Sequence, residues 1–119
     1  MASGDAHIGT LIEHLRKGPR WHETVVIVTF DENGGWWDHV APPKGDRWGP
    51  GTRIPALVIS PLAKRGAVDH TLYDTTSILR LITRLHDLPQ LEGLALRDAE
   101  RARLGLAPLG DLSGALNLG

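Results

Sequence analysis

The chain has 119 residues, of which 41% are hydrophobic and 23% are charged, as in an ordinary globular domain. Its formal net charge is −1 and its 13 lysines and arginines are scattered, so the sequence offers no basic face for nucleic acid or an anionic membrane. It has no cysteine, which excludes disulfides and thiolate chemistry. It also lacks an apolar run of the roughly 18–20 residues that a membrane span needs, and no signal peptide is visible. We expect one small domain, or part of one.

The first predicted elements are a helix over residues 5–17 and a strand that starts at Thr24. The strand is rich in β-branched residues, and its apolar run over 25–28 suits a strand buried on both faces. A helix followed by a short turn and a buried strand predicts an α/β fold with a parallel sheet. The helix is indicated by apolar residues at helical spacing, namely Ile8, Leu11, Ile12 and Leu15.

A second strand is predicted over 54–60, a second helix over 75–88 and a short helix within 94–109. The tail from Gly110 carries leucines that we expect to dock on a surface. Two helices cannot cover both faces of two buried strands. We therefore interpret residues 1–119 as a single, partial domain that needs an additional segment or a partner chain to complete its core. The docking leucines are Leu112, Leu116 and Leu118.

The segment 32–53 is a long loop rich in glycine and proline. A loop of this length in a compact domain is usually functional or disordered, and its tryptophans argue against disorder. Trp36, Trp37 and Trp48 are interpreted as core anchors, with a substrate-stacking platform as the alternative.

Asp31 and Glu32 are the strongest candidates for chemistry, because they stand where the first strand ends. Ligands of α/β proteins bind outside the carboxyl ends of strands. Two carboxylates with Asn33 nearby offer hard oxygen ligands for a divalent metal ion whose identity the sequence leaves open. The alternative is a solvated turn made by the same residues.

The residues around this pair each have two interpretations. Gly34 and Gly35 either form a turn or allow close backbone approach to a ligand. Asp38 and His39 are either structural or supply a general acid or base and orient a metal ligand. His70 follows the second strand and is a candidate for the same cleft. The chain contains no Gly-x-Ser-x-Gly elbow, phosphate-cradling loop or His-Glu-x-x-His motif, so no nucleophile is assigned.

Several motifs together resemble the C-terminal part of the bacterial phosphoesterase family, which contains phospholipases C and acid phosphatases and belongs to the alkaline phosphatase-like superfamily. The resemblance runs through most of the chain in unbroken order. The motifs that carry it are Trp21 with Thr24, the segment 26–43, the segment 49–61 and the segment 73–80.

This resemblance implies the C-terminal portion of an α/β/α sandwich with a mostly parallel sheet. It also implies hydrolysis of phosphate esters, phospholipids among them, with a bound metal and a serine or threonine nucleophile. Asp31 and Glu32 match an Asp-Glu pair that holds the metal in that family, and His39 matches a residue that contacts the phosphate or a metal ligand. The family's N-terminal Glu-Asn ligands and its nucleophile have no counterpart in this chain. Family members of full length are secreted or periplasmic.

Three hypotheses remain open from the sequence. In the first, the chain supplies part of the metal site of a phosphoric ester hydrolase and is inactive alone. The second is a non-catalytic α/β module that binds or assembles with a partner. In the third, Asp31, Glu32, Asp38 and His39 form a complete metal site by themselves.

Overall fold

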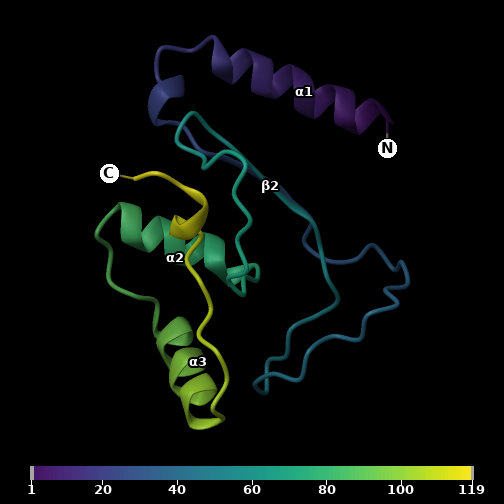
Figure 1. The fold of residues 1–119 in the computed structure, drawn as a ribbon, viewed down its shortest axis with the longest axis vertical. Coiled ribbons are helices and arrows are strands. Elements are labelled where there is room, and N and C mark those ends of the chain that lie inside the picture. Colours follow the sequence, from purple (N-terminus) through teal and green to yellow (C-terminus); the bar gives the residue numbers. More distant parts are fainter. Residues whose placement is uncertain (1, 119) are drawn as a thin grey trace.

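The computed structural model describes residues 2–118 and contains three α-helices and two strands (Figure 1). All three predicted helices are present, with ends that differ from the prediction by a few residues. No helix of this part of the chain is both long and apolar enough to cross a membrane. The elements in order are α1 (Ala2–Arg16), the 3-10 turn η1 (Trp21–Glu23), β1 (Val26–Thr29), β2 (Ala56–Ile59), α2 (Thr76–Leu85), α3 (Glu92–Arg103) and the 3-10 turn η2 (Ser113–Ala115).

The two strands form an antiparallel pair, so the prediction that they are parallel is wrong. Val26 pairs with Ile59, and Thr29 pairs with Ala56. A parallel pair needs a crossover, usually helical, that returns the chain to the other end of the first strand. Here the connection contains no helix, and β2 begins beside the C-terminal end of β1. At that end the Thr29 hydroxyl donates to the Pro55 carbonyl at 2.9 Å.

Neither strand contains a fully buried residue, which corrects the prediction that both faces are buried. Side chains alternate between the faces of a strand. Val25, Ile27 and Val58 pack against the core, whereas Leu57 on the other face of β2 is exposed. Among the described residues, β1 is half-buried throughout, and the first half of β2 is exposed.

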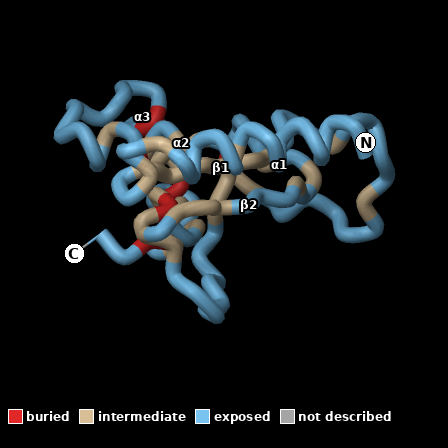
Figure 2. The backbone as a smooth tube through the Cα atoms, turned by 90° about the horizontal axis from the view of Figure 1, so that it is seen from above, coloured by how far each residue is buried: buried red, intermediate tan, exposed pale blue. Residues whose placement is uncertain are grey.

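The core of the described chain is small and lies between α2 and the C-terminal tail (Figure 2). Leu81 of α2 contacts Leu112 and Leu116, and all three side chains are buried. The tail is held there by a backbone bridge between Ala63 and Leu116. The docking prediction is thus confirmed for Leu112 and Leu116, whereas Leu118 is exposed.

The start of α2 is fixed by reciprocal capping. The Thr76 amide donates to Asp74 Oδ1 at 2.9 Å, and the Asp74 amide donates to the Ser77 hydroxyl at 3.1 Å. Such bonds satisfy amides that have no partner within the helix. They also orient Asp74, whose other carboxylate oxygen is used in the ion network described below.

The described chain exposes more surface than a compact domain of its size. Its accessible surface is 8950 Å², against roughly 6,300 Å² for a folded monomer of this mass. Its radius of gyration is 16.1 Å, against about 13.5 Å for a compact domain. Helix α1 contributes to this excess, because it stands apart from the other helices and its apolar stripe, which includes Ile8, Leu11 and Leu15, is exposed (Figures 1 and 2).

The substitution Leu81→Ala tests the position of the core. It removes a buried side chain shared by α2 and the tail, so the free energy of unfolding is expected to fall by roughly 2–5 kcal/mol. Urea denaturation measures the loss. Leu79→Ala on the exposed side of the same helix is the matched control and should cost less than about 1 kcal/mol. Equal losses in the two variants would place the core elsewhere.

Candidate active site

The predicted metal-binding pair lies where β1 opens into the loop that connects it to β2. Asp31 and Glu32 come directly after Phe30, and both side chains are exposed. The Glu32 amide donates to Asp31 Oδ1 at 3.1 Å, a bond that fixes the turn but leaves carboxylate oxygens of the pair free for a ligand. The structure therefore presents two adjacent carboxylates to solvent at a strand end.

The residues that follow form a tight turn. The Asn33 side chain accepts from the Gly35 amide and donates to the Trp36 carbonyl, both at 3.1 Å. Gly34 and Gly35 have φ of 65° and 76°, in the left-handed region that favours glycine. The geometry agrees with the turn interpretation of these glycines, and the Asn33 side chain is engaged within that turn.

Asp38 and Arg53 close the loop on itself by a bidentate ion pair. Arg53 Nε donates to Asp38 Oδ2 at 3.0 Å, and Nη2 donates to Oδ1 at 2.8 Å. These hydrogen bonds, together with one from the Val40 amide, hold the pKa of Asp38 well below its usual range. Asp38 is thus an ionised structural anchor. The neighbouring His39 side chain is largely exposed, with Nδ1 3.9 Å from Asp38 Oδ1.

Two clefts meet at this end of the sheet. The first, here called the aromatic cleft, has a volume of about 810 Å³. The second, the acidic cleft, has a volume of about 770 Å³ and continues beneath the loop toward the start of α2 and toward α3. Glu32, Asn33, Arg53 and Ile54 line both clefts. The other residues of the aromatic cleft are Phe30, Gly34, Trp36, Trp37, Asp38, His39 and Pro55. The other residues of the acidic cleft are Asp31, Pro42, Pro43, Gly49, Pro50, Gly51, Thr52, Leu72, Tyr73, Asp74, Thr75 and Arg97.

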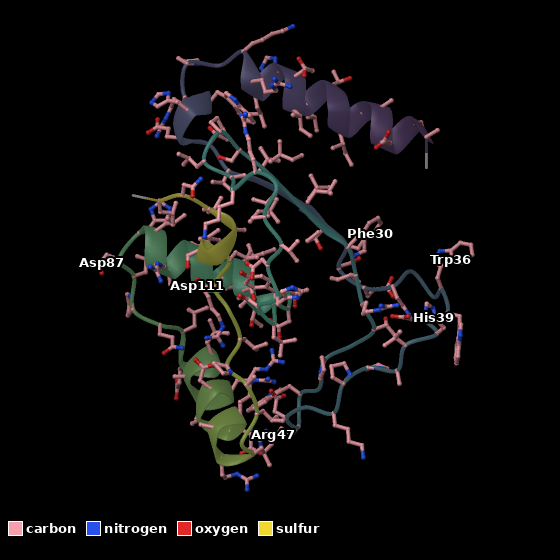
Figure 3. The ribbon with its side chains drawn as sticks, in the orientation of Figure 1. Phe30, Trp36, His39, Arg47, Asp87 and Asp111 are labelled. Carbon is pink, nitrogen blue, oxygen red and sulfur yellow. The ribbon has the colours of Figure 1, made fainter. Side chains whose placement is uncertain are left out.

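The tryptophans of the loop are exposed, so the interpretation of them as core anchors is wrong. Trp36 is 76% exposed and Trp37 is 92% exposed. Figure 3 shows Trp36 and His39 at the outer bend of the loop, away from the helices. Trp48 is about half exposed and stacks with the guanidinium of Arg47 at 4.4 Å. Nothing in the described chain reaches over the outer bend to bury these rings.

The middle of the loop is anchored by a buried ion network. The Asp46 side chain has no exposed surface, and its Oδ2 accepts from Arg97 Nε at 2.9 Å and from Arg101 Nη1 at 3.4 Å. Burial opposes ionisation of Asp46, but the hydrogen bonds from Arg97, the Trp48 amide and Arg101 outweigh it and lower its pKa. A buried carboxylate is tolerated only when it is paired in this way. The network thus ties the loop to α3.

The structure brings some of the predicted site residues together and not others. Asp31 and Glu32 share the acidic cleft, and Glu32 shares the aromatic cleft with Asp38 and His39. His70 is exposed in the segment before α2 and lines neither cleft.

Three residues near the clefts were missed by sequence reasoning. Arg53 carried a signal, because it lies in the segment 49–61 of the family resemblance. Arg97 and Asp46 carried none, since their pairing joins positions 51 residues apart.

The donors present fit a divalent cation only in part. Asp31 and Glu32 are hard oxygen ligands of the kind that Mg²⁺, Ca²⁺ and Mn²⁺ prefer. Within residues 2–118, however, no three His, Cys, Asp or Glu side chains are arranged to hold a metal ion. This finding does not support a complete local site made by Asp31, Glu32, Asp38 and His39, since the Asp38 carboxylate is turned toward Arg53; that hypothesis stays a prediction.

The pairing of Asp38 with Arg53 predicts a pH effect. Arg53 lowers the pKa of Asp38. The pair therefore stabilises the folded loop at pH values above 3.8, the ordinary carboxyl pKa, and this stabilisation is lost as the pH falls through the lower pKa of the folded state. In Arg53→Gln the pKa of Asp38 is expected to rise toward 3.8. A carbon-detected NMR titration of the Asp38 carboxyl would measure this rise. Arg47→Gln is the control and should leave it unchanged. Equal pKa values in wild type and Arg53→Gln would contradict the pairing.

With this geometry established, comparison with known proteins identifies the relatives of the chain. The model of the Phosphoesterase family matches residues 1–89. Phospholipase C B of Mycobacterium tuberculosis is 33% identical over 121 residues, covering 82% of this chain and 22% of its own length. Phospholipase C A of the same species is 30% identical in an alignment that covers 98% of this chain and 26% of the phospholipase. Non-specific phospholipase C6 of Arabidopsis thaliana is 30% identical and covers 74% of this chain and 22% of its own length.

No solved structure matches the chain. The chain spans about a quarter or less of the length of these relatives. The described part agrees with an α/β fragment, and the family model covers about three quarters of the chain, since it matches 89 of 119 residues. The chain belongs to the Phosphoesterase family, a family of phosphoric ester hydrolases.

Proposed function

We propose that this chain supplies the C-terminal part of the active site of a metal-dependent phosphoric ester hydrolase. The observation that carries the proposal is the placement of Asp31 and Glu32, adjacent and exposed at the end of β1, where they line the acidic cleft in a chain of the Phosphoesterase family. Two neighbouring carboxylates repel each other, and a divalent cation between them removes that repulsion.

A bound cation would act as a Lewis acid toward the phosphoryl oxygens and lower the pKa of a hydroxyl nucleophile. Asp31 and Glu32 would hold it from one side with their carboxylate oxygens. The pair places two negative charges beside the cleft, so an anionic substrate is repelled until the cation is bound. Substrate binding is therefore proposed to depend on the metal.

Arg53 is the residue of this chain that we assign to the phosphoryl oxygens. Its side chain is 61% exposed and lines both clefts, which meet at Glu32. Asp38 occupies Nε and Nη2, and the remaining donors of the guanidinium fork are available for an anion. Asp38 thereby orients Arg53. His39 lines the aromatic cleft as well, and we propose that it contacts the phosphate there.

The remaining metal ligands and the nucleophile are proposed to come from outside residues 1–119. The chain spans about a quarter of the length of these relatives, and it exposes apolar surface on α1 and at the outer bend of the loop. Such surface is normally covered by another part of a protein. We accordingly expect the chain alone to be inactive and to bind metal weakly.

A phospholipid is the proposed substrate class, because the named relatives are phospholipases C. The exposed rings of Trp36 and Trp37, which line the aromatic cleft beside Glu32, are compatible with an amphipathic substrate. The alternative function is a non-catalytic α/β module that assembles with a partner through the same exposed apolar surface.

Metal titration of the chain tests the proposed role of the acidic pair. Calorimetry with Mn²⁺ is expected to show weak binding that disappears in the double variant Asp31→Ala/Glu32→Ala. Asp5→Ala/Glu92→Ala, which removes two exposed acids elsewhere, is the control for net charge and should bind like wild type. Tight one-to-one binding would show a self-sufficient site, and binding that survives loss of the pair would reject Asp31 and Glu32 as ligands.

A further inference from the structure

The two walls of the acidic cleft are joined by a single guanidinium group. One wall is the loop that carries Asp31 and Glu32, and the other is the start of α2 at Asp74 and Thr75. Arg97 of α3 lines the cleft between them. Its Nε donates to Asp46 of the loop at 2.9 Å, and its Nη1 lies 2.7 Å from Asp74 Oδ2.

This contact is buried and balanced in charge. The Arg97 side chain is 10% exposed, that of Asp46 has no exposed surface, and that of Asp74 is 17% exposed. Arg101, also buried, adds a second positive charge at Asp46. The two carboxylates balance the two guanidiniums, and the Arg97 side chain, unlike that of Arg53, is nearly closed to solvent. Its place in the cleft is therefore that of a structural link.

The link also reaches the backbone of both walls. Asp46 Oδ1 accepts from the Trp48 amide at 3.0 Å, and the Asp46 carbonyl accepts from the Gly49 amide at 2.9 Å. These bonds fix the loop just before the segment 49–54, which lines the same cleft as Asp74. On the other side, Asp74 Oδ1 holds the Thr76 amide. Arg97 thus pairs with two carboxylates, Asp46 and Asp74, each of which binds backbone amides of one wall.

We propose that Arg97 is a positioning residue that sets the separation of the two walls and so holds Asp31 and Glu32 in their binding geometry, an inference that rests on the proposed metal role of that pair. Arg97 lies beyond residues 1–89, the part that matches the family model. Helix α3 would then be part of the site although it supplies no ligand. A lysine cannot replace the arginine, because one ammonium group does not reproduce a planar fork that bonds two carboxylates in fixed directions.

The test measures Mn²⁺ affinity and amide hydrogen exchange in the 119-residue chain and its variants. Arg97→Gln removes the guanidinium and with it the bonds to both walls, Asp46→Asn removes the carboxylate charge on the loop side, and Arg97→Lys keeps the positive charge. Arg103→Gln, on the same helix and in an exposed pair with Glu100, is the matched control. Exchange is followed at the Trp48 and Thr76 amides, which report the two walls, and at the β1–β2 ladder as an internal reference for global stability.

We expect Arg97→Gln and Asp46→Asn to weaken Mn²⁺ binding about tenfold, the lower end of the loss seen when groups that orient metal ligands are removed. Arg97→Lys should not restore the affinity, and the double variant Asp46→Asn/Arg97→Gln should be no weaker than Arg97→Gln. Exchange in Arg97→Gln should rise at Trp48 and Thr76 relative to the ladder. Arg103→Gln should match wild type in both measurements.

Two results would overturn the proposal. One is an unchanged Mn²⁺ affinity, per folded molecule, in both Arg97→Gln and Asp46→Asn. The other is a rise in exchange that is as large in the ladder as at Trp48 and Thr76, which would make Arg97 a general stabiliser. If wild type binds no Mn²⁺, the metal proposal fails, and exchange alone then decides whether Arg97 links the walls. A selective rise at both amides supports the link, and no selective rise rejects it.

Discussion

The carboxylate of Asp46 is the constraint on which the arrangement of the loop depends. Its side chain is removed from solvent, and a buried charge of this kind is stable only when it is neutralised and hydrogen-bonded. Arg97 and Arg101 provide that neutralisation from α3. Because Arg97 also bonds Asp74, the same group connects the loop, α3 and the start of α2. The walls of the acidic cleft are thus defined by one ionic network.

Apolar packing contributes less to this arrangement than is usual. The buried cluster consists of Leu81, Leu112 and Leu116, with partly buried neighbours from the sheet. Apolar residues on α1, Leu57 of β2 and the rings at the outer bend of the loop remain exposed. In a complete domain such faces are expected to contact other elements. Within residues 2–118, no three His, Cys, Asp or Glu side chains are arranged to hold a metal ion, and the proposal that further ligands come from outside residues 1–119 accounts for both observations.

The sequence was most informative where the signal is local. Helical spacing of apolar residues identified the first two helices, and the strand followed by Asp31 and Glu32 identified the place of the clefts. The sheet was predicted wrongly as parallel, because two apolar strands look alike in either direction and only the course of the loop between them decides. The burial of Trp36 and Trp37 was also predicted wrongly, since ring size indicates a preference for burial but does not supply the surface that covers the ring. The link between Asp46 and Arg97 joins positions far apart in sequence, which no local pattern reveals.

The central claim is that Asp31 and Glu32 supply part of a hydrolytic metal site. The most direct test replaces the matching segment of Phospholipase C B from Mycobacterium tuberculosis with this chain and measures phospholipid hydrolysis on vesicles. The account predicts metal-dependent hydrolysis that falls by about two orders of magnitude or more in Asp31→Ala/Glu32→Ala and persists in Asp5→Ala/Glu92→Ala. Hydrolysis that continues at the full rate without Asp31 and Glu32, in a chimera that remains folded, would contradict it.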